Sequence, residues 1–251
     1  MSDFLSGKVA VVTGASRGLG RAIAVSLAAE GIRVALVARS VTNLARTARA
    51  IQDQGGEAAV FAADLTREDQ VAQLERAVSA HFGKIQILVN NAGVNLRKPL
   101  VDFTLDEWRG VMDGNHTSAF LMCRAFVPHM KGTGYGRIIN LSSIMGHVSL
   151  PERAAYSSSK AALLGLTRAL ALELAGDGIT VVAISPGPCS TEMNAPILND
   201  PEWNASFLAK IPVHKWGRPE DIGALAAFIC SEAASFITGT DILIDGGWTA
   251  Q

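Results

Sequence analysis

Short apolar runs alternate with amphipathic stretches along the whole chain. The runs are rich in Val, Ile and Ala and carry too few polar residues to alternate, which is typical of strands buried on both faces. Seven such strands are predicted, at 9–13, 34–38, 58–62, 85–90, 137–141, 181–184 and 242–244. Helical periodicity fills the intervals at 18–30, 41–54, 67–82, 105–131, 156–175 and 219–230.

This alternation predicts the fold class. Strands that alternate with helices form right-handed crossovers, which produce a parallel sheet covered by helices on both faces. No repeat, low-complexity tract or linker interrupts the 251 residues. We therefore expect a single doubly wound α/β domain over residues 1–251, with about seven parallel strands.

One irregular segment, residues 185–219, holds six of the nine prolines. It follows the sixth predicted strand and is long for a connection in a compact domain. Long loops of this kind commonly carry function. We expect a substrate loop or lid with its own short helices, and the alternative is a rigid surface excursion.

Composition narrows the classes of function. The net charge of −1 provides no electrostatic footprint for nucleic acid or an anionic membrane. The apolar stretches are too short to span a bilayer, and the first residues lack the pattern of a secretory leader. Three scattered cysteines favour a reducing, cytoplasmic location over a disulfide framework. The five histidines show no metal-ligand spacing, so we expect no metal.

A glycine-rich turn, T-G-A-S-R-G-L-G at 13–20, directly follows the first predicted strand. Glycine permits a tight turn and a close approach of backbone to ligand, and the N-terminus of the next helix attracts phosphate. The spacing is G-x-x-x-G-x-G and differs from the common G-x-G-x-x-G fingerprint. The segment nevertheless predicts a nucleotide site, at Gly14, Ser16, Arg17, Gly18, Leu19 and Gly20.

Ligands of doubly wound sheets bind at the carboxyl ends of the strands. Small and polar residues follow the predicted strands there, and the candidates for cofactor binding are Arg39, Ser40, Asp64, Leu65, Asn91, Ala92, Gly93, Pro186, Gly187 and Thr191.

The end of the second strand indicates which cofactor binds. NAD sites place an acidic residue there, whereas this chain has Arg39, with Arg17 in the glycine turn. Two guanidinium groups favour the 2′-phosphate of NADP(H), and the alternative is a pair of solvated arginines. Asp64 is expected to accept a hydrogen bond from adenine, to serve as an acid at a helix N-terminus, or both.

Candidate proton-transfer chemistry lies in Tyr156-Ser-Ser-Ser-Lys160, where positions i and i+4 share a helix face. An ammonium beside a phenol lowers the phenol pKa from about 10 and suits it to general acid–base catalysis. The alternative is a surface pair at a helix start. Ser143 ends the fifth predicted strand, thirteen residues before Tyr156.

Together these motifs resemble the short-chain dehydrogenase/reductase family over essentially the whole chain. They are the glycine turn, N-N-A-G at 90–93, Asn115, Ser143, Tyr156-x-x-x-Lys160, Pro186-Gly187 with Thr191, and D-G-G at 245–247. The resemblance implies a Rossmann-type fold and hydride transfer between a nicotinamide cofactor and an alcohol or ketone. It also implies a homotetramer, formed through helices and the C-terminal segment.

The resemblance further implies a role for each residue of a catalytic set. Tyr156 exchanges a proton with the substrate oxygen, and Lys160 lowers the tyrosine pKa and binds the nicotinamide ribose. Ser143 holds the substrate carbonyl and stabilises developing negative charge. Asn115 kinks its helix and holds a water that links Lys160 to solvent. On the cofactor side, Asn91 and Gly93 line the cleft, and Thr191 meets the nicotinamide carboxamide.

The substrate is harder to infer. The segments 96–99, 216–219 and 245–248, with Trp108, are similar to the gluconate 5-dehydrogenase branch. A sugar acid needs a cation to bind its carboxylate, and the candidates are Arg97, His147 and Arg153. The alternative for each of the three is a solvated surface side chain. A 3-oxoacyl-carrier-protein reductase is the alternative enzyme, and an NADP(H)-binding sensor without activity is the alternative outside catalysis.

Overall fold

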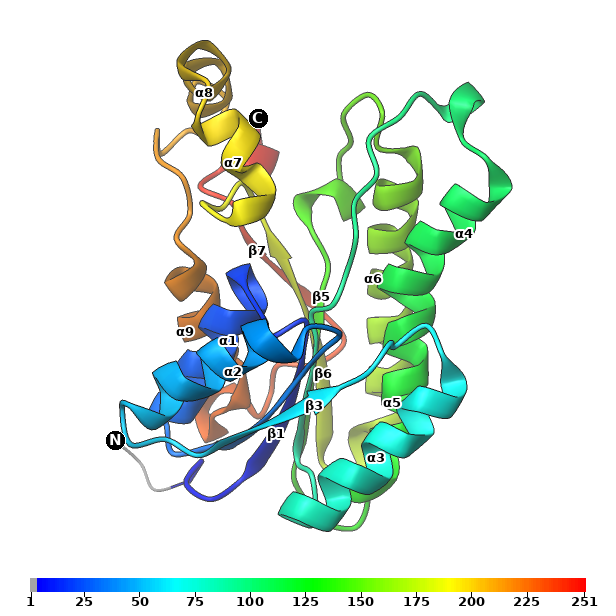
Figure 1. The fold of residues 1–251 in the computed structure, drawn as a ribbon, viewed down its shortest axis with the longest axis vertical. Coiled ribbons are helices and arrows are strands. Elements are labelled where there is room, and N and C mark those ends of the chain that lie inside the picture. The colour runs from blue at the N-terminus through cyan, green and yellow to red at the C-terminus, as the bar shows by residue number, and fades with distance from the viewer. Residues whose placement is uncertain (1–3) are drawn as a thin grey trace.

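The computed structural model describes residues 4–251 and contains one seven-stranded parallel sheet in the order β3-β2-β1-β4-β5-β6-β7 (Figure 1). The strands are β1 (Val9–Thr13), β2 (Arg33–Ala38), β3 (Ala58–Ala62), β4 (Ile87–Asn90), β5 (Gly136–Leu141), β6 (Ile179–Pro186) and β7 (Asp241–Ile244). The predicted doubly wound α/β fold is confirmed. The main differences are that β4 begins two residues later than predicted and that β6 is longer at both ends.

Helices cover both faces of the sheet, as Figure 1 shows. One layer contains α1 (Gly18–Ala29), α2 (Val41–Gln52) and α9 (Pro219–Cys230), and the other contains α3 (Glu68–Phe82), α4 (Leu105–Met112), α5 (Ser118–Met130) and α6 (Ala154–Leu174). Two short helices, α7 (Ala195–Leu198) and α8 (Pro201–Leu208), lie within the proline-rich segment. Among residues 4–251, no helix is long and apolar enough to cross a membrane.

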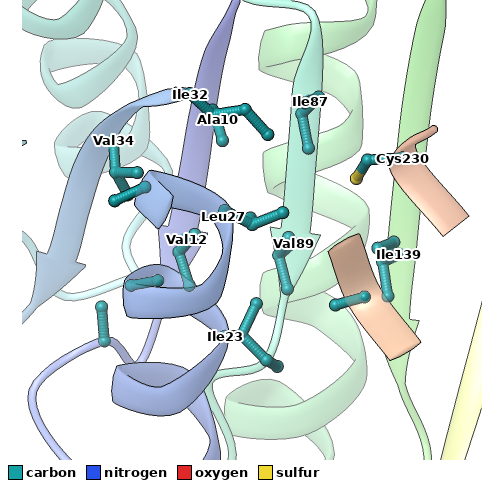
Figure 2. Packing of buried hydrophobic residues seen from close by; sticks show 14 of the residues in the cluster. Ala10, Val12, Ile23, Leu27, Ile32, Val34, Ile87, Val89, Ile139 and Cys230 are labelled. Atoms are coloured by element: carbon teal, nitrogen blue, oxygen red, sulfur yellow. The ribbon is translucent and has the colours of Figure 1, made fainter. Parts of the chain in front are cut away.

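The continuous apolar runs have a direct structural reason. Successive side chains of a strand point to opposite faces, so a strand covered on both sides needs an apolar residue at every position. In β1, Ala10 and Val12 pack with α1, whereas Val9 and Val11 belong to the core on the other side. Figure 2 shows Val12 beside Leu27 of α1.

The helix predicted over 105–131 is interrupted. Residues Asp113–Thr117 form a π-helical turn between α4 and α5. The buried Asn115 side chain is bonded to the backbone of Val94, which accounts for the distortion: its Oδ1 accepts from Val94 N at 2.6 Å and its Nδ2 donates to Val94 O at 2.9 Å. Helical periodicity does not report a bond of this kind, and for that reason the pattern predicts one helix.

A hydrogen-bonded junction fixes the carboxyl ends of β1 and β4, where the strand order reverses. Thr13 Oγ1 accepts from the N–H groups of Asn91 at 2.9 Å and Ala92 at 3.0 Å, and it donates to Val89 O at 3.1 Å. Asn91 Nδ2 in turn donates to Thr13 O at 2.8 Å. The reversal point of a doubly wound sheet is where a ligand cleft opens, and this junction sets its floor.

The glycine turn packs against the same junction. A Cβ at Gly14 would lie 2.7 Å from Asn91 Nδ2, and a Cβ at Gly20 would overlap both that nitrogen and Gly14 O. Two of the three glycines are therefore required by contacts within the protein. Gly18 has a φ of +54°, which favours glycine, and a Cβ there would be in ordinary van der Waals contact with Glu192 and Thr191, at 3.5–3.7 Å.

We expect Gly20→Ala to lower the free energy of unfolding by ~1–3 kcal/mol, because the added methyl overlaps atoms that have no room to move. Chemical denaturation measures this loss. Gly110→Ala is the matched control, since a Cβ there meets nothing within 4 Å and should leave stability unchanged or slightly higher. Equal stability of Gly20→Ala and the wild type would contradict the packing described here.

Candidate active site

A cleft of about 560 Å³ opens at the carboxyl edge of the sheet. The glycine turn, the segments after β2 to β6 and the C-terminal Trp248 form its wall. Each cofactor-binding candidate predicted from the sequence lies on this wall, namely Gly14, Ser16, Arg17, Gly18, Leu19, Gly20, Arg39, Ser40, Asp64, Leu65, Asn91, Ala92, Gly93, Tyr156, Lys160, Pro186, Gly187 and Thr191. The topology thus gathers residues from the whole chain into one site.

Arg17 and Arg39 both line the cleft and are both exposed. Within residues 4–251, neither guanidinium forms an ion pair. Nearby, Asp64 Oδ1 accepts from Thr66 N at 3.1 Å and Thr66 Oγ1 at 2.8 Å. These bonds, helped by the charge of Arg39, lower the pKa of Asp64. The cleft wall therefore offers a ligand two cations that have no ion-pair partner in the described part of the chain.

Lys160 is buried against the end of β5. Its Nζ donates to Leu141 O at 2.6 Å and lies 5.7 Å from the ring centre of Tyr156. Ser142 Oγ donates to the Lys160 carbonyl at 2.9 Å, which ties the helix to the strand. Burial lowers the pKa of Lys160 from 10.5 to about 8.

Opposing effects act on the pKa of Tyr156. Burial raises its pKa above 10, whereas hydrogen bonding with Ser143 and the positive charge of Arg153 lower it. The net direction is opposite to the one expected from Lys160 alone, because burial disfavours the phenolate more than its neighbours favour it. Arg153 is the cation whose charge lowers the pKa of the phenol, an effect that the sequence did not predict.

Asn115 lies behind the cleft wall, next to the segment that carries Lys160. Besides its two bonds to Val94, its Nδ2 donates to Ser159 Oγ at 2.9 Å, next to Lys160. A Cβ at Gly93 would lie 3.0 Å from Asn115 Oδ1 and 3.6 Å from Lys160 Nζ. The absence of a side chain at Gly93 therefore keeps the approach to Lys160 open.

Arg97 and Arg153 line the cleft with Tyr156 and Ser143. Burial and the charge of Arg97 both lower the pKa of Arg153, so the two guanidinium groups are near each other. Arg97 also lies over the ring of Trp203 in α8, 5.9 Å from its centre. Two cations thus stand beside the candidate acid–base tyrosine.

His147 is the substrate candidate that the structure places elsewhere. It does not line the cleft, and its Nε2 lies 2.6 Å from Asp241 Oδ2 beside a second, smaller cavity. The prediction that His147 contacts substrate is corrected by this position. The histidine follows a short turn, Ile144–Gly146, that directs it towards β7.

One part of the wall is aromatic and was not predicted from the sequence. Phe207 of α8 and Trp248 both line the cleft, with ring centres 5.2 Å apart, and Phe207 stacks on Trp216 at 5.4 Å. The signal available was the density of aromatic residues in a segment already expected to be a binding loop. Asn95, also on the wall, has a buried Oδ1 that bonds to none of the described residues.

The comparisons with known proteins agree with this geometry. A family model described as enoyl-(acyl carrier protein) reductase matches residues 14–249. The chain belongs to the short-chain dehydrogenase/reductase family. It is therefore an oxidoreductase acting on alcohol or carbonyl groups, and the family uses nicotinamide cofactors.

Relatives within the short-chain dehydrogenase/reductase family have diverse substrates. The chain is 43% identical to 3beta-hydroxysteroid dehydrogenase 1 of Eggerthella lenta, covering 99% of this chain and 96% of the relative. It is 38% identical to a 3-oxoacyl-[acyl-carrier-protein] reductase of Synechocystis, with 97% of each chain covered. A crystal structure of a candidate NAD(P)-dependent gluconate 5-dehydrogenase from Beutenbergia cavernae, with NADP at low occupancy, superposes with a TM-score of 0.93 at 39% identity and 98% coverage of both chains.

The pKa of Lys160 gives a prediction about stability. Because folding lowers this pKa from 10.5 to about 8, the unfolded chain holds more protons between these values, and the free energy of unfolding rises with pH across that window. Relative to Lys160→Met, the wild type should gain ~1–3 kcal/mol between pH 8 and 10.5. Urea unfolding at a series of pH values measures the gain.

Lys84→Met is the control for this experiment, since Lys84 is exposed. It should leave the pH dependence of unfolding unchanged. Parallel pH profiles of the wild type and Lys160→Met would show that burial does not perturb Lys160.

Proposed function

We propose that this protein is an NADP(H)-dependent oxidoreductase that interconverts a secondary alcohol and a ketone on a sugar acid of the gluconate type. The observation that carries the proposal is the meeting of Ser143, Tyr156 and Lys160 with Arg97 and Arg153 on one cleft wall. The first three residues supply proton transfer to and from the substrate oxygen. The two arginines supply charge for a carboxylate.

The cleft fits a nicotinamide dinucleotide. The glycine turn at the start of α1 supplies N–H groups for the pyrophosphate, and Gly18 lies beside Thr191 on the cleft wall. Arg17 and Arg39 would hold the 2′-phosphate, and Asp64 would face the adenine. The bound cofactor supplies hydride chemistry, and the protein supplies orientation and charge.

The proton steps fall to the protein. In ketone reduction, Tyr156 donates its hydroxyl proton to the substrate oxygen, and in alcohol oxidation it accepts that proton. A phenol whose pKa is raised by burial remains protonated at neutral pH, as an acid for reduction requires. Ser143 donates a hydrogen bond to the same substrate oxygen, and Lys160 stabilises the phenolate.

The charge near Tyr156 supports this substrate class. Two guanidinium groups that repel each other are stabilised by an anion between them, and a carboxylate matches their bidentate geometry. The relative from Beutenbergia cavernae supports this choice, because its structure is described as a gluconate 5-dehydrogenase candidate. The segment 185–219 would act as the substrate loop or lid, since it contributes Phe207 and Thr191 to the wall.

The alternative enzyme, a 3-oxoacyl-carrier-protein reductase, is favoured by the relative from Synechocystis. Such an enzyme needs basic surface for an acidic carrier protein. Three basic residues are suited to that role. Arg124 pairs with Glu68 and Lys131 with Asp177 at 3.7 Å, whereas Arg168 is exposed and forms no ion pair within residues 4–251. These pairs reduce the positive charge available to a carrier, so we favour the sugar acid.

We also propose a homotetramer in the cytoplasm. On α6, Leu172 is 84% exposed although the neighbouring Ala171 and Leu174 are buried, so this helix offers an apolar position to another copy.

The proposed location in the cytoplasm is supported by the cysteines. Cys123, Cys189 and Cys230 are free and buried, which suits a reducing compartment.

Tyr156→Phe tests the proposed chemistry. Absorbance at 340 nm should show that the wild type reduces NADP⁺ with gluconate at mildly alkaline pH. The variant should lose at least ~10³-fold in kcat because it lacks the proton donor, and should bind NADPH as the wild type does. Turnover by Tyr156→Phe would contradict the role of this residue, whereas wild-type turnover of an acetoacetyl thioester instead of gluconate would establish the alternative substrate.

Arg39→Asp tests the cofactor preference. Replacing a cation by an anion should weaken binding of NADPH by at least ~10-fold and leave NADH binding unchanged or tighter. Fluorescence titration with each nucleotide measures both values. Arg46→Asp is the control, because Arg46 is exposed on α2 and is not on the cleft wall. Equal losses of NADPH affinity in the two variants would indicate a general charge effect and contradict a specific contact.

A further inference from the structure

His147 is joined to two strands by a cluster of short contacts. Its Nε2 lies 2.6 Å from Asp241 Oδ2 at the start of β7. Ser185 of β6 donates from Oγ to Asp241 Oδ1 at 2.9 Å, and Ser185 Oγ also lies 3.5 Å from His147 Nε2. We call this cluster of His147, Asp241 and Ser185 the clasp.

The clasp runs from the buried Ser185 to the exposed His147 and stands outside the cleft. Ser185 is fully buried, and the side chains of Asp241 and His147 are 14% and 32% exposed. His147 and Asp241 line a second cavity of about 260 Å³, none of whose lining residues also lines the cleft. A substrate beside Tyr156 is therefore not the natural partner of either side chain.

What the clasp holds is the turn that carries Ser143. The turn Ile144–Gly146 begins directly after Ser143 and ends at His147. Within it, Ser143 O accepts from Gly146 N at 2.8 Å, and Ile144 O accepts from the N–H groups of His147 and Val148, both at 2.9 Å. One end of the turn is thus anchored by β5 and the other by the clasp.

The turn also sits tightly against α6. A Cβ at Gly146 would lie 2.9 Å from Ser142 Oγ and 3.2 Å from the carbonyl carbon of Lys160. A small displacement of the turn would therefore change the position of Ser143 relative to the helix that carries Tyr156 and Lys160. Errors of about 1 Å at a reacting centre are costly to a rate.

We propose that the clasp is a positioning device that fixes the Ser143 turn against α6, with His147 acting as a positioning residue for the reaction. The inference rests on the proposed role of Ser143. It does not depend on which sugar acid, or other carbonyl compound, occupies the cleft.

The hydrogen bond itself suggests the informative variants. The imidazole donates from Nε2 to Asp241 either as the neutral tautomer with Nε2–H or as the cation. A glutamine places its amide nitrogen near the same point and retains the donor, whereas a leucine of similar size removes it. His147→Gln should therefore rescue what His147→Leu loses.

Steady-state kinetics test the effect on the reaction, with whichever substrate the wild type turns over. For His147→Leu we expect kcat to fall about tenfold, the Kd of NADPH to stay within twofold, and His147→Gln to restore kcat to within about threefold. Ser185→Ala, which keeps the His147–Asp241 contact, should fall between the two. Leu243→Met is the control, since it lines the same cavity on β7 outside the clasp and should behave as the wild type.

Hydrogen exchange tests the positioning without turnover. The amides of Gly146, His147 and Val148 should exchange at least tenfold faster in His147→Leu and at the wild-type rate in His147→Gln. Unchanged exchange in His147→Leu would overturn the proposal, as would unchanged kcat or a failure of glutamine to rescue. Failure of the proposed function is distinguishable, because the wild type itself would then show no turnover while the exchange experiment still decides whether the clasp holds the turn.

Discussion

The hydrogen-bonded junction between Thr13 and Asn91 is the contact on which the cleft depends. It joins the carboxyl ends of β1 and β4, the two strands between which the order of the sheet reverses. Helices leave the sheet in opposite directions from this point, so a gap opens there in every doubly wound fold. In this protein the gap has a firm floor, because backbone and side-chain groups of both strands are mutually satisfied.

Close packing at this junction changes the interpretation of the glycine motif. Gly14 and Gly20 leave room for the Asn91 amide, whereas Gly18 lies beside Thr191 and is favoured by its positive φ. The glycine turn and N-N-A-G are therefore two halves of one structural unit, although some seventy residues separate them. A substitution in either half would therefore disturb the packing of the other.

Burial governs the electrostatics of the candidate catalytic residues. It lowers the pKa of Lys160 to about 8 and raises that of Tyr156, so each group is shifted towards its neutral form. Ser143 and Arg153 counteract the shift at the tyrosine. The clasp around His147 adds a mechanical element, since the position of Ser143 depends on contacts made on the far side of its turn.

The sequence by itself determined the strands, most of the helices and the residues of the cofactor cleft. These features depend on local periodicity and on the rule that parallel strands end at one edge, so they can be read from order alone. Only the tertiary structure decided that His147 points to Asp241, that Phe207 meets Trp248, and that burial outweighs the effects of Ser143 and Arg153 on the pKa of Tyr156. Each of these depends on distances between residues far apart in the chain, and on the solvent they exclude, which no sequence pattern specifies.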